Sequence, residues 1–284
     1  MVDLNIPKIL HLYWGRNKKL SYMKYLTVKS FSILNPDWKI KVYCSNEISL
    51  AESWGSKEQK SYEYQGEDCF ADLSGIANTD VVEFDFSIFN IGELCSEVHK
   101  SDILRLYILS TEGGVWSDFD ILYLKSMDEL HIKSIGPGEN ACFCFSGGYH
   151  SIGFLMSTPN SMVFSYLLGI ALEESKNKEL EYQSLGSNLF LHFFHHNKLK
   201  FGEFNERCES NILNIPFVAI YPFAWSQADS LFEKIQYQFM EKTIGVHWYA
   251  GANSTSKYEN IVTKDNIKES EDIFLLKLMG EICE

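Results

Sequence analysis

Apolar and polar positions alternate along the first part of the chain in a strand–helix–strand order. Residues 8–13 are a short apolar segment and residues 39–44 alternate regularly, so both are predicted to be β-strands. Between them, residues 21–34 have helical spacing and begin with Ser21, a typical N-cap. This order predicts parallel strands and an α/β sheet of the nucleotide-binding type.

The middle of the chain combines a polar stretch with an apolar helix and a glycine break. Residues 52–80 are polar, acidic and aromatic, and we expect an insertion of short helices and loops there. Residues 93–110 have helical spacing, and Gly113-Gly114 after them is typical of a helix C-terminus. The following residues, 115–124, are predicted to form one extended segment.

The second half of the chain adds further elements to the expected sheet. Strands are predicted at residues 141–145, 151–156, 217–220 and 243–248. Helices are predicted at residues 158–174 with Thr158-Pro159 in the first turn, at residues 187–197 with Ser187 as the cap, and from about residue 266 onward. No internal repeat is found, so we expect one α/β domain over residues 1–284.

Composition and charge narrow the class of protein. The 284 residues are 45% hydrophobic and 22% charged, which excludes intrinsic disorder. The net charge of −13 argues against a nucleic-acid-binding protein. It does not argue against an anionic ligand held by a metal ion and backbone N–H groups. No secretory signal is recognised, and no apolar stretch reaches the ~18–20 residues that span a bilayer, so no integral membrane segment is expected.

Cysteine spacing indicates reduced thiols. The seven cysteines stand at positions 44, 69, 95, 142, 144, 208 and 283. Cys142 and Cys144 would share one face of a strand, but no second pair or histidine stands at the spacing of a zinc site. We therefore expect buried, reduced thiols and a cytoplasmic location.

Two charged residues stand on one face of the predicted apolar helix. Asp102 and Arg105 are three positions apart, and their apolar neighbours imply burial. A buried acid and guanidinium are paired with one another or bound to a ligand. Taken alone, such a pair is more typical of a structural ion pair than of a ligand site.

Two further acids, Asp118 and Asp120, flank Phe119 in the predicted extended segment. Alternate side chains share one face of a strand, so the two carboxylates converge while Phe119 points into the core. Converging carboxylates repel unless a cation lies between them, and hard oxygen ligands select Mg²⁺ or Mn²⁺. The alternative is a pair of solvated acids at a strand end.

The order Ser-Asp-x-x-Arg, Gly-Gly, Asp-x-Asp over residues 101–120 resembles the sugar-binding region of D-x-D glycosyltransferases of the GT-A type. That group includes fungal α-mannosyltransferases, bacterial capsule and lipopolysaccharide transferases, and the glucosylating domains of clostridial toxins. Residues 6–15 and 35–38 also resemble the group's first strand and the segment before its second strand. The resemblance implies a GT-A fold, which is a Rossmann-like nucleotide-binding mixed sheet flanked by helices.

The resemblance also implies which residues bind the nucleotide part of the donor. Trp14 would border or stack on the nucleobase, although a core tryptophan is an equal alternative. Leu12, Tyr13 and Ser101 would belong to the same nucleotide-sugar site, and Trp116 would line the nucleoside pocket.

By the same resemblance, a second set of residues would hold the sugar, the diphosphate and the metal. Asp102 would bind hydroxyls of the donor sugar, and Arg105 would bridge that sugar and the diphosphate. Asp118 would contact ribose and sugar or the metal, and Asp120 would bind the metal directly. His247, at the end of a predicted strand, would complete the shell of a Mn²⁺ or Mg²⁺ ion; an ordinary strand-end histidine is the alternative.

The remaining candidates lie in loops of the second half. Ser254 or a backbone N–H near it would contact the diphosphate, and residues 146–150 would lie under the acceptor. Gln183 and Asn188 are candidates for contacts with the reacting sugar. Relatives often carry Gly-Pro in this segment, whereas Gly186-Ser187 stands here.

The implied function is metal-dependent transfer of a hexosyl group from a UDP- or GDP-linked sugar to a hydroxyl of a glycan or lipid-linked glycan. By resemblance the reaction retains the anomeric configuration and serves surface polysaccharide or glycoconjugate synthesis. Residues 1–130 would bind the donor, and residues 131–284 would form the acceptor side and a C-terminal metal and diphosphate loop.

Two alternatives remain. The first is a phosphatase that forms an aspartyl-phosphate, which is disfavoured because Gly-Gly precedes the motif and Ile121-Leu122 follow it. The second is a catalytically silent GT-A fold that binds a sugar nucleotide or a glycan.

Overall fold

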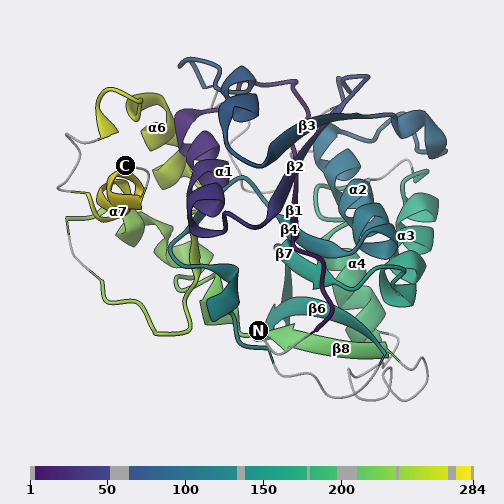
Figure 1. The fold of residues 1–284 in the computed structure, drawn as a ribbon. Coiled ribbons are helices and arrows are strands. Elements are labelled where there is room, and N and C mark those ends of the chain that lie inside the picture. Colours follow the sequence, from purple (N-terminus) through teal and green to yellow (C-terminus); the bar gives the residue numbers. More distant parts are fainter. Residues whose placement is uncertain are drawn as a thin grey trace.

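The computed structural model describes residues 4–51, 64–132, 138–177, 180–196, 210–234, 237–267 and 273–282 (Figure 1). Its centre is a seven-stranded sheet in the order β3-β2-β1-β4-β7-β6-β8. The strands of this sheet are β1 (Ile9–Tyr13), β2 (Lys39–Ser45), β3 (Thr79–Phe84), β4 (Gly114–Ser117), β6 (Glu139–Ser146), β7 (Tyr149–Ser157) and β8 (Ser210–Ile215). A second, two-stranded sheet pairs β5 (Ile121–Tyr123) with β9 (Gly245–His247).

Helices cover both faces of the large sheet (Figure 1). The helices are α1 (Tyr22–Leu34), α2 (Glu97–Thr111), α3 (Met162–Glu174), α4 (Ser187–Leu191), α6 (Asn253–Ile261) and α7 (Phe274–Ile282). One core cluster joins α1 to the sheet through residues such as Val28 and Phe31, and another packs α2, α3 and α4 on the opposite face. This mixed sheet between helices confirms the predicted α/β class.

The parallel half of the sheet follows the predicted strand–helix–strand unit. β1 pairs in parallel with β2 and β4, and β2 pairs in parallel with β3. The Ser21 side chain accepts a hydrogen bond from the backbone N–H of Lys24, so it caps α1 as predicted. Edge strand β3 was not predicted, because most of its side chains are exposed or only half-buried and show no apolar face.

The antiparallel half is built on a hairpin. β7 pairs with β4 and with β6, and Gly147 and Gly148 turn between β6 and β7 with positive φ. The Asp-x-Asp segment leaves the sheet at the end of β4, beside β7. Residues 115–124 are therefore not one extended segment, because a turn at Phe119-Asp120 separates β4 from β5.

Three further predictions of local structure were wrong. Residues 217–219 form a 3₁₀ helix after Pro216 instead of a strand, although Ala219 and Ile220 are buried as expected. Helix α3 begins at Met162 with Ser161 as its cap, since the Ser161 hydroxyl accepts from the N–H of Phe164. The predicted helix from residue 187 is present as α4, which passes into a π-helical turn at residues 192–196, but its cap is Gly186 and not Ser187.

Five cysteines, at positions 44, 69, 95, 142 and 144, are buried free thiols, as predicted. Burial raises the pKa of Cys142 to about 12 and so holds it in the neutral form. Cys208 and Cys283 lie outside the described residues. Among the helices that the structure describes, none combines the length and the apolar character needed to cross a bilayer.

Candidate active site

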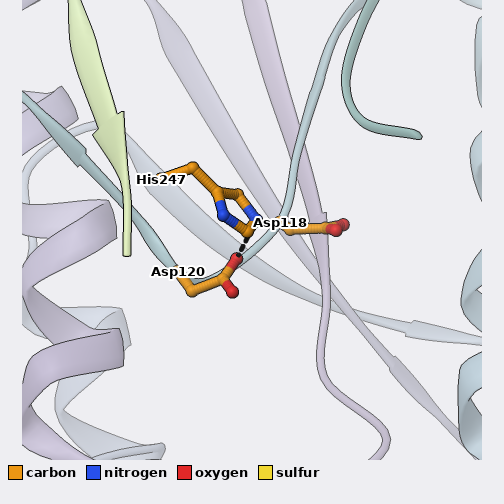
Figure 2. Close-up of side chains that lie close together, drawn as sticks. All are labelled: Asp118, Asp120 and His247. Carbon is orange, nitrogen blue, oxygen red and sulfur yellow. Dashed lines mark ion pairs between the residues drawn. The ribbon is translucent and has the colours of Figure 1, made fainter. Parts of the chain in front are cut away.

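Two carboxylates and an imidazole meet where β4 and β9 end (Figure 2). The Asp118 N–H donates to the carbonyl of Gly153 in β7 at 2.8 Å, which fixes the start of the turn. The Asp120 carbonyl accepts from the N–H of Trp248 at 2.8 Å, and Ile121 pairs with His247 in the small sheet. Candidate ligand atoms of Asp118, Asp120 and His247 consequently lie within 4.8 Å of one another. The structure brings together all three residues predicted as metal ligands.

Asp120 is held from two directions. Its Oδ1 lies 3.0 Å from His247 Nε2, and its Oδ2 accepts a hydrogen bond from the Ala250 N–H at 2.9 Å. Burial by itself would raise the pKa of this carboxyl. The neighbouring His247 ring, the Ala250 N–H and the Lys24 ammonium outweigh burial and hold the pKa below its usual range. Asp120 is therefore an anion at neutral pH.

Asp118 is held by the sheet beneath it. Its Oδ1 accepts a hydrogen bond from the indole N–H of Trp116 at 3.1 Å and lies 3.6 Å from Nη1 of Arg105. The Trp116 ring is only 1% exposed, so it supports Asp118 from the core, and the Arg105 guanidinium lies 5.1 Å from its centroid. The Asp118 side chain itself is 32% exposed and so is accessible to a ligand.

The chemistry of this cluster fits a hard divalent cation. Two carboxylates and an imidazole are ligands that Mn²⁺ accepts, and oxygen atoms of a ligand can complete its shell. The candidate ligand atoms lie within 4.8 Å of one another, close enough for one ion to contact all three. Mn²⁺ or Mg²⁺ thus fits the residues present.

Asp102 and Arg105 form a buried ion pair beside this cluster. Arg105 Nη2 lies 2.9 Å from Asp102 Oδ1, but the approach lacks hydrogen-bond geometry, and neither Asp102 oxygen has a hydrogen-bond partner among the described residues. Burial raises the pKa of Asp102 to about 7, against the opposing effect of Arg105. An acid in this state is ready to bind hydroxyl groups of a ligand.

Arg105 is fixed by its other donors. Nη1 donates to the carbonyl of Ile152 at 2.6 Å, and Nη2 donates to the hydroxyl of Ser101 at 3.1 Å. The guanidinium plane therefore joins α2 to β7. Its charge stays between Asp102 and Asp118, the two acids predicted to contact the donor sugar.

Residues at the end of β1 lie next to the same turn. The Trp14 ring packs edge-to-face on Phe119, with 5.6 Å between centroids, and is half-buried, so one part of it remains accessible. Leu12 is fully buried in the core. Tyr13 is also buried and donates its hydroxyl hydrogen bond to Glu97. Phe119 is 5% exposed and points into the core, as predicted.

The acceptor-side candidates are less tightly connected to this cluster. A Cβ built on Gly186 would lie 3.3 Å from Asp102 Oδ2, so residues 182–188 do border the Asp102 pocket. The backbone carbonyl of Gln183 accepts from the N–H of Asn188 at 3.2 Å, and the Asn188 side chain is exposed. Ser254 is the second residue of α6, and its side chain lies outside the described part of the structure.

The hairpin loop over residues 146–150 is tied to this segment. Tyr149 in the hairpin and Ser187 in α4 place their hydroxyl oxygens 3.2 Å apart. The predicted acceptor loop and the predicted sugar-side segment are therefore neighbours in the structure.

Sequence reasoning missed several groups around the cluster. Lys24 of α1 forms an ion pair with Glu259 of α6, and its ammonium lies 5.7 Å from the centroid of Trp14. Nothing in the sequence marks the Ala250 N–H, because its hydrogen bond to Asp120 depends on the path of the loop after β9. A lysine in the first turn of an amphipathic helix is equally unremarkable in a single sequence.

The chain matches a known protein family over the region that carries these residues. Residues 23–140 match the model of the family described as the glycosyltransferase sugar-binding region containing the DXD motif. The matched range holds Asp102, Arg105, Asp118 and Asp120 and confirms the resemblance stated from the motif. His247 lies beyond the matched range.

Several solved structures are similar in outline to this chain. PaToxG glycosyltransferase is 16% identical, with a TM-score of 0.49 over 72% of this chain and 74% of that one. The galactosyltransferase LgtC, in complex with donor and acceptor sugar analogues, is 12% identical, with a TM-score of 0.44 over 92% and 99%. The glycosyltransferase GlyE of Streptococcus pneumoniae TIGR4 is 11% identical, with a TM-score of 0.45 over 96% and 63%. The comparison with curated proteins found no significant match.

Proposed function

Since residues 23–140 match the model of the glycosyltransferase sugar-binding region containing the DXD motif, we propose that this chain transfers a hexosyl group from a nucleoside diphosphate sugar to a hydroxyl of a glycan or lipid-linked glycan. The donor nucleotide is UDP or GDP, and the cofactor is Mn²⁺ or Mg²⁺. The observation that supports this most directly is the convergence of Asp118, Asp120 and His247 beside the buried Asp102–Arg105 pair.

The reaction breaks the bond between the anomeric carbon and the diphosphate oxygen and forms a bond from that carbon to the acceptor oxygen. A bound divalent cation supplies Lewis-acid stabilisation of the negative charge on the departing diphosphate. Asp102 accepts or donates hydrogen bonds at the sugar hydroxyls, and burial in this pocket strengthens them. Arg105 adds a fixed positive charge close to Asp118, already oriented by Ile152 and Ser101.

We further propose retention of the anomeric configuration. In a front-face reaction the departing phosphate takes the acceptor proton, so no separate protein base is needed. Product NMR at the anomeric centre tests this, and a product of inverted configuration would overturn it.

We propose that residues 1–130 bind the donor and that residues 131–284 provide the acceptor side. His247 comes from the second part, so the two parts would share the metal. Gln183, Asn188 and the loop over residues 146–150 are the candidates for contacts with the acceptor or the reacting sugar, because they border Asp102 through Gly186 and Ser187. Surface polysaccharide or glycoconjugate synthesis would then be the pathway.

A donor screen with metal control tests the proposal. The protein is incubated with UDP-, GDP- and CMP-linked sugars in Mn²⁺ or in EDTA, and the released nucleotide is measured. We expect release from one donor, dependent on Mn²⁺. In Asp120→Asn, loss of a direct ligand should lower the rate about a hundredfold or more. Asp80→Asn is the matched control, because Asp80 is a 56% exposed acid on the edge strand β3.

The same screen separates the enzyme from a silent binding protein. A binding protein would show a thermal shift with the nucleotide and Mn²⁺ but would release no nucleotide from any donor. The release must stay absent when a panel of glycan acceptors is added. Near-normal release in Asp120→Asn would remove the metal assignment.

A further inference from the structure

Tyr221 places a buried hydroxyl next to the metal cluster without giving it a hydrogen-bond partner. Its side chain is 5% exposed, and its ring packs against His247 at 5.0 Å and against Phe217 at 4.7 Å between centroids. Among the described residues the hydroxyl makes no hydrogen bond of good geometry, although Ser151 approaches it. Burying a hydroxyl without a partner costs about 1–3 kcal/mol of folding free energy. Packing alone therefore does not explain a hydroxyl at this position.

Gly153 creates the space between this hydroxyl and Asp118. A Cβ built on Gly153 would lie 2.9 Å from Asp118 Oδ2 and 3.0 Å from the Tyr221 hydroxyl oxygen. Both oxygens therefore border the same small volume, and any other residue at 153 would fill it. The φ of Gly153 is not in the left-handed region, so the requirement is for space and not for backbone freedom.

The two carboxylate oxygens of Asp118 have different neighbours. Oδ1 accepts from Trp116 and lies near Arg105, whereas Oδ2 faces Gly153 and Tyr221. The element that carries Tyr221 is also fixed to the cluster, because the Ile220 carbonyl accepts from the N–H of His247 at 2.8 Å. Tyr221 is thus held in a fixed position relative to His247, one of the three candidate ligands.

We propose that Tyr221 is a positioning residue for Asp118 in the metal-bound protein: when a cation is bound, its hydroxyl donates to Oδ2 across the space at Gly153 while Trp116 donates to Oδ1, and together they orient the carboxylate toward the cation. This inference rests on the proposed metal-dependent function. Hydrogen-bond partners of metal ligands commonly change metal affinity or activity by 10–100-fold when removed. Tyr221→Phe removes the hydroxyl and keeps the ring that packs on His247 and Phe217.

The test measures Mn²⁺ binding directly, without turnover. Titration of the protein with Mn²⁺ alone, followed by electron paramagnetic resonance of the free ion, gives the Kd for wild type and variants. We expect Tyr221→Phe to raise the Kd about tenfold or more and to raise the Mn²⁺ concentration that half-saturates donor release by a similar factor. The unfolding temperature in EDTA should not fall, since the hydroxyl makes no hydrogen bond of good geometry in the part of the chain that the structure describes.

Tyr249→Phe is the matched control. Tyr249 also packs on His247, at 4.4 Å between centroids, but its hydroxyl donates to the Phe223 carbonyl. Its Kd for Mn²⁺ should stay within about twofold of wild type. One outcome is that Asp120→Asn abolishes Mn²⁺ binding while Tyr221→Phe has the same Kd as wild type. In that case the metal site stands, and only the role proposed for Tyr221 is overturned. A wild type whose Mn²⁺ binding is absent or indifferent to Asp120→Asn would overturn the metal site and this inference together.

Discussion

At the scale of the residue, two buried titratable groups have pKa values shifted in opposite directions. Burial raises the pKa of Asp102 to about 7 and lowers that of His11 to about 4. His11 lies in the core of β1, where its ring nitrogens contact the Tyr43 hydroxyl at 3.2 Å and the Gly113 carbonyl at 2.9 Å. Both shifts favour the neutral form of the group in the folded protein.

The two shifts act on stability with opposite signs over the same pH range. Between pH ~4 and ~7 the folded protein holds a proton on Asp102 that the unfolded chain releases, so stability falls as pH rises. Between pH ~6.5 and ~4 the unfolded chain takes up a proton that folded His11 refuses, so stability falls as pH falls. The effect is on the order of 4 kcal/mol for Asp102 and 3 kcal/mol for His11, and the two partly cancel.

Single variants should therefore reveal each effect. We expect the free energy of unfolding of Asp102→Asn to fall more steeply than that of wild type when the pH is lowered from about 6.5 to 4.5. In His11→Gln it should fall less steeply than in wild type, or rise. Urea unfolding at several pH values in EDTA measures this. Plots of unfolding free energy against pH that run parallel to the wild-type plot would contradict the pKa shifts assigned to Asp102 and His11.

The residues of the candidate site divide into those that a single sequence reveals and those that it hides. Asp102, Arg105, Asp118 and Asp120 lie within one short segment, so their fixed spacing predicts that they act together. Tyr221, Gly153 and the Ala250 N–H come from distant segments. Their contacts exist only once β4, β7 and β9 are assembled, and no local pattern signals them.

At the scale of the element, the small sheet β5–β9 sets the distance between Asp120 and His247. Gly245 in β9 is packed tightly against β5, since a Cβ there would lie 3.2 Å from Ile121 Cγ2 and 3.3 Å from the Leu122 carbonyl. A backbone oxygen cannot move aside as a side chain does. A Cβ at 245 would therefore shift its neighbours in β5 by a few tenths of an ångström.

Gly245→Ala should thus weaken Mn²⁺ binding, although Gly245 is not one of the candidate ligands. We expect a loss of about 1–3 kcal/mol in the free energy of unfolding and a several-fold higher Kd for Mn²⁺. Gly75→Ala is the matched control, because a Cβ there meets nothing within 4 Å. Urea unfolding and Mn²⁺ titration of both variants give the comparison. An unchanged Kd in Gly245→Ala would show that the strand spacing does not govern the ligands.

Element prediction succeeded where local signals agree with the tertiary environment. Helix α1 has a cap and an apolar face, and β1 and β2 are apolar and central, so all three were predicted. Strands β3 and β8 were missed because they are edge strands with polar positions. The segment over residues 217–219 is apolar because it is buried, and its 3₁₀ form follows from Pro216 and from packing that the sequence does not display.

At the scale of the whole molecule, a cation bound by the fold should stabilise it. Mn²⁺ at about 100 times its Kd adds about 2.7 kcal/mol, which raises the unfolding temperature of a chain of this size by several degrees. We expect this rise in wild type and in Asp80→Asn, and its loss in Asp120→Asn. Because the net charge of −13 attracts cations everywhere on the surface, an equal rise in Asp120→Asn would indicate diffuse binding only.

The return of the chain to Asp120 also has a consequence for biosynthesis. Asp120 Oδ2 accepts a hydrogen bond from the N–H of Ala250, which lies 130 positions later in the chain. At a synthesis rate of roughly 5–20 residues per second, a ribosome needs on the order of 10 s to add that span. The nascent chain therefore exposes the complete Asp-x-Asp motif long before its partners exist. Assembly of the working centre is a late event, and a truncated translation product that keeps the motif would still lack it.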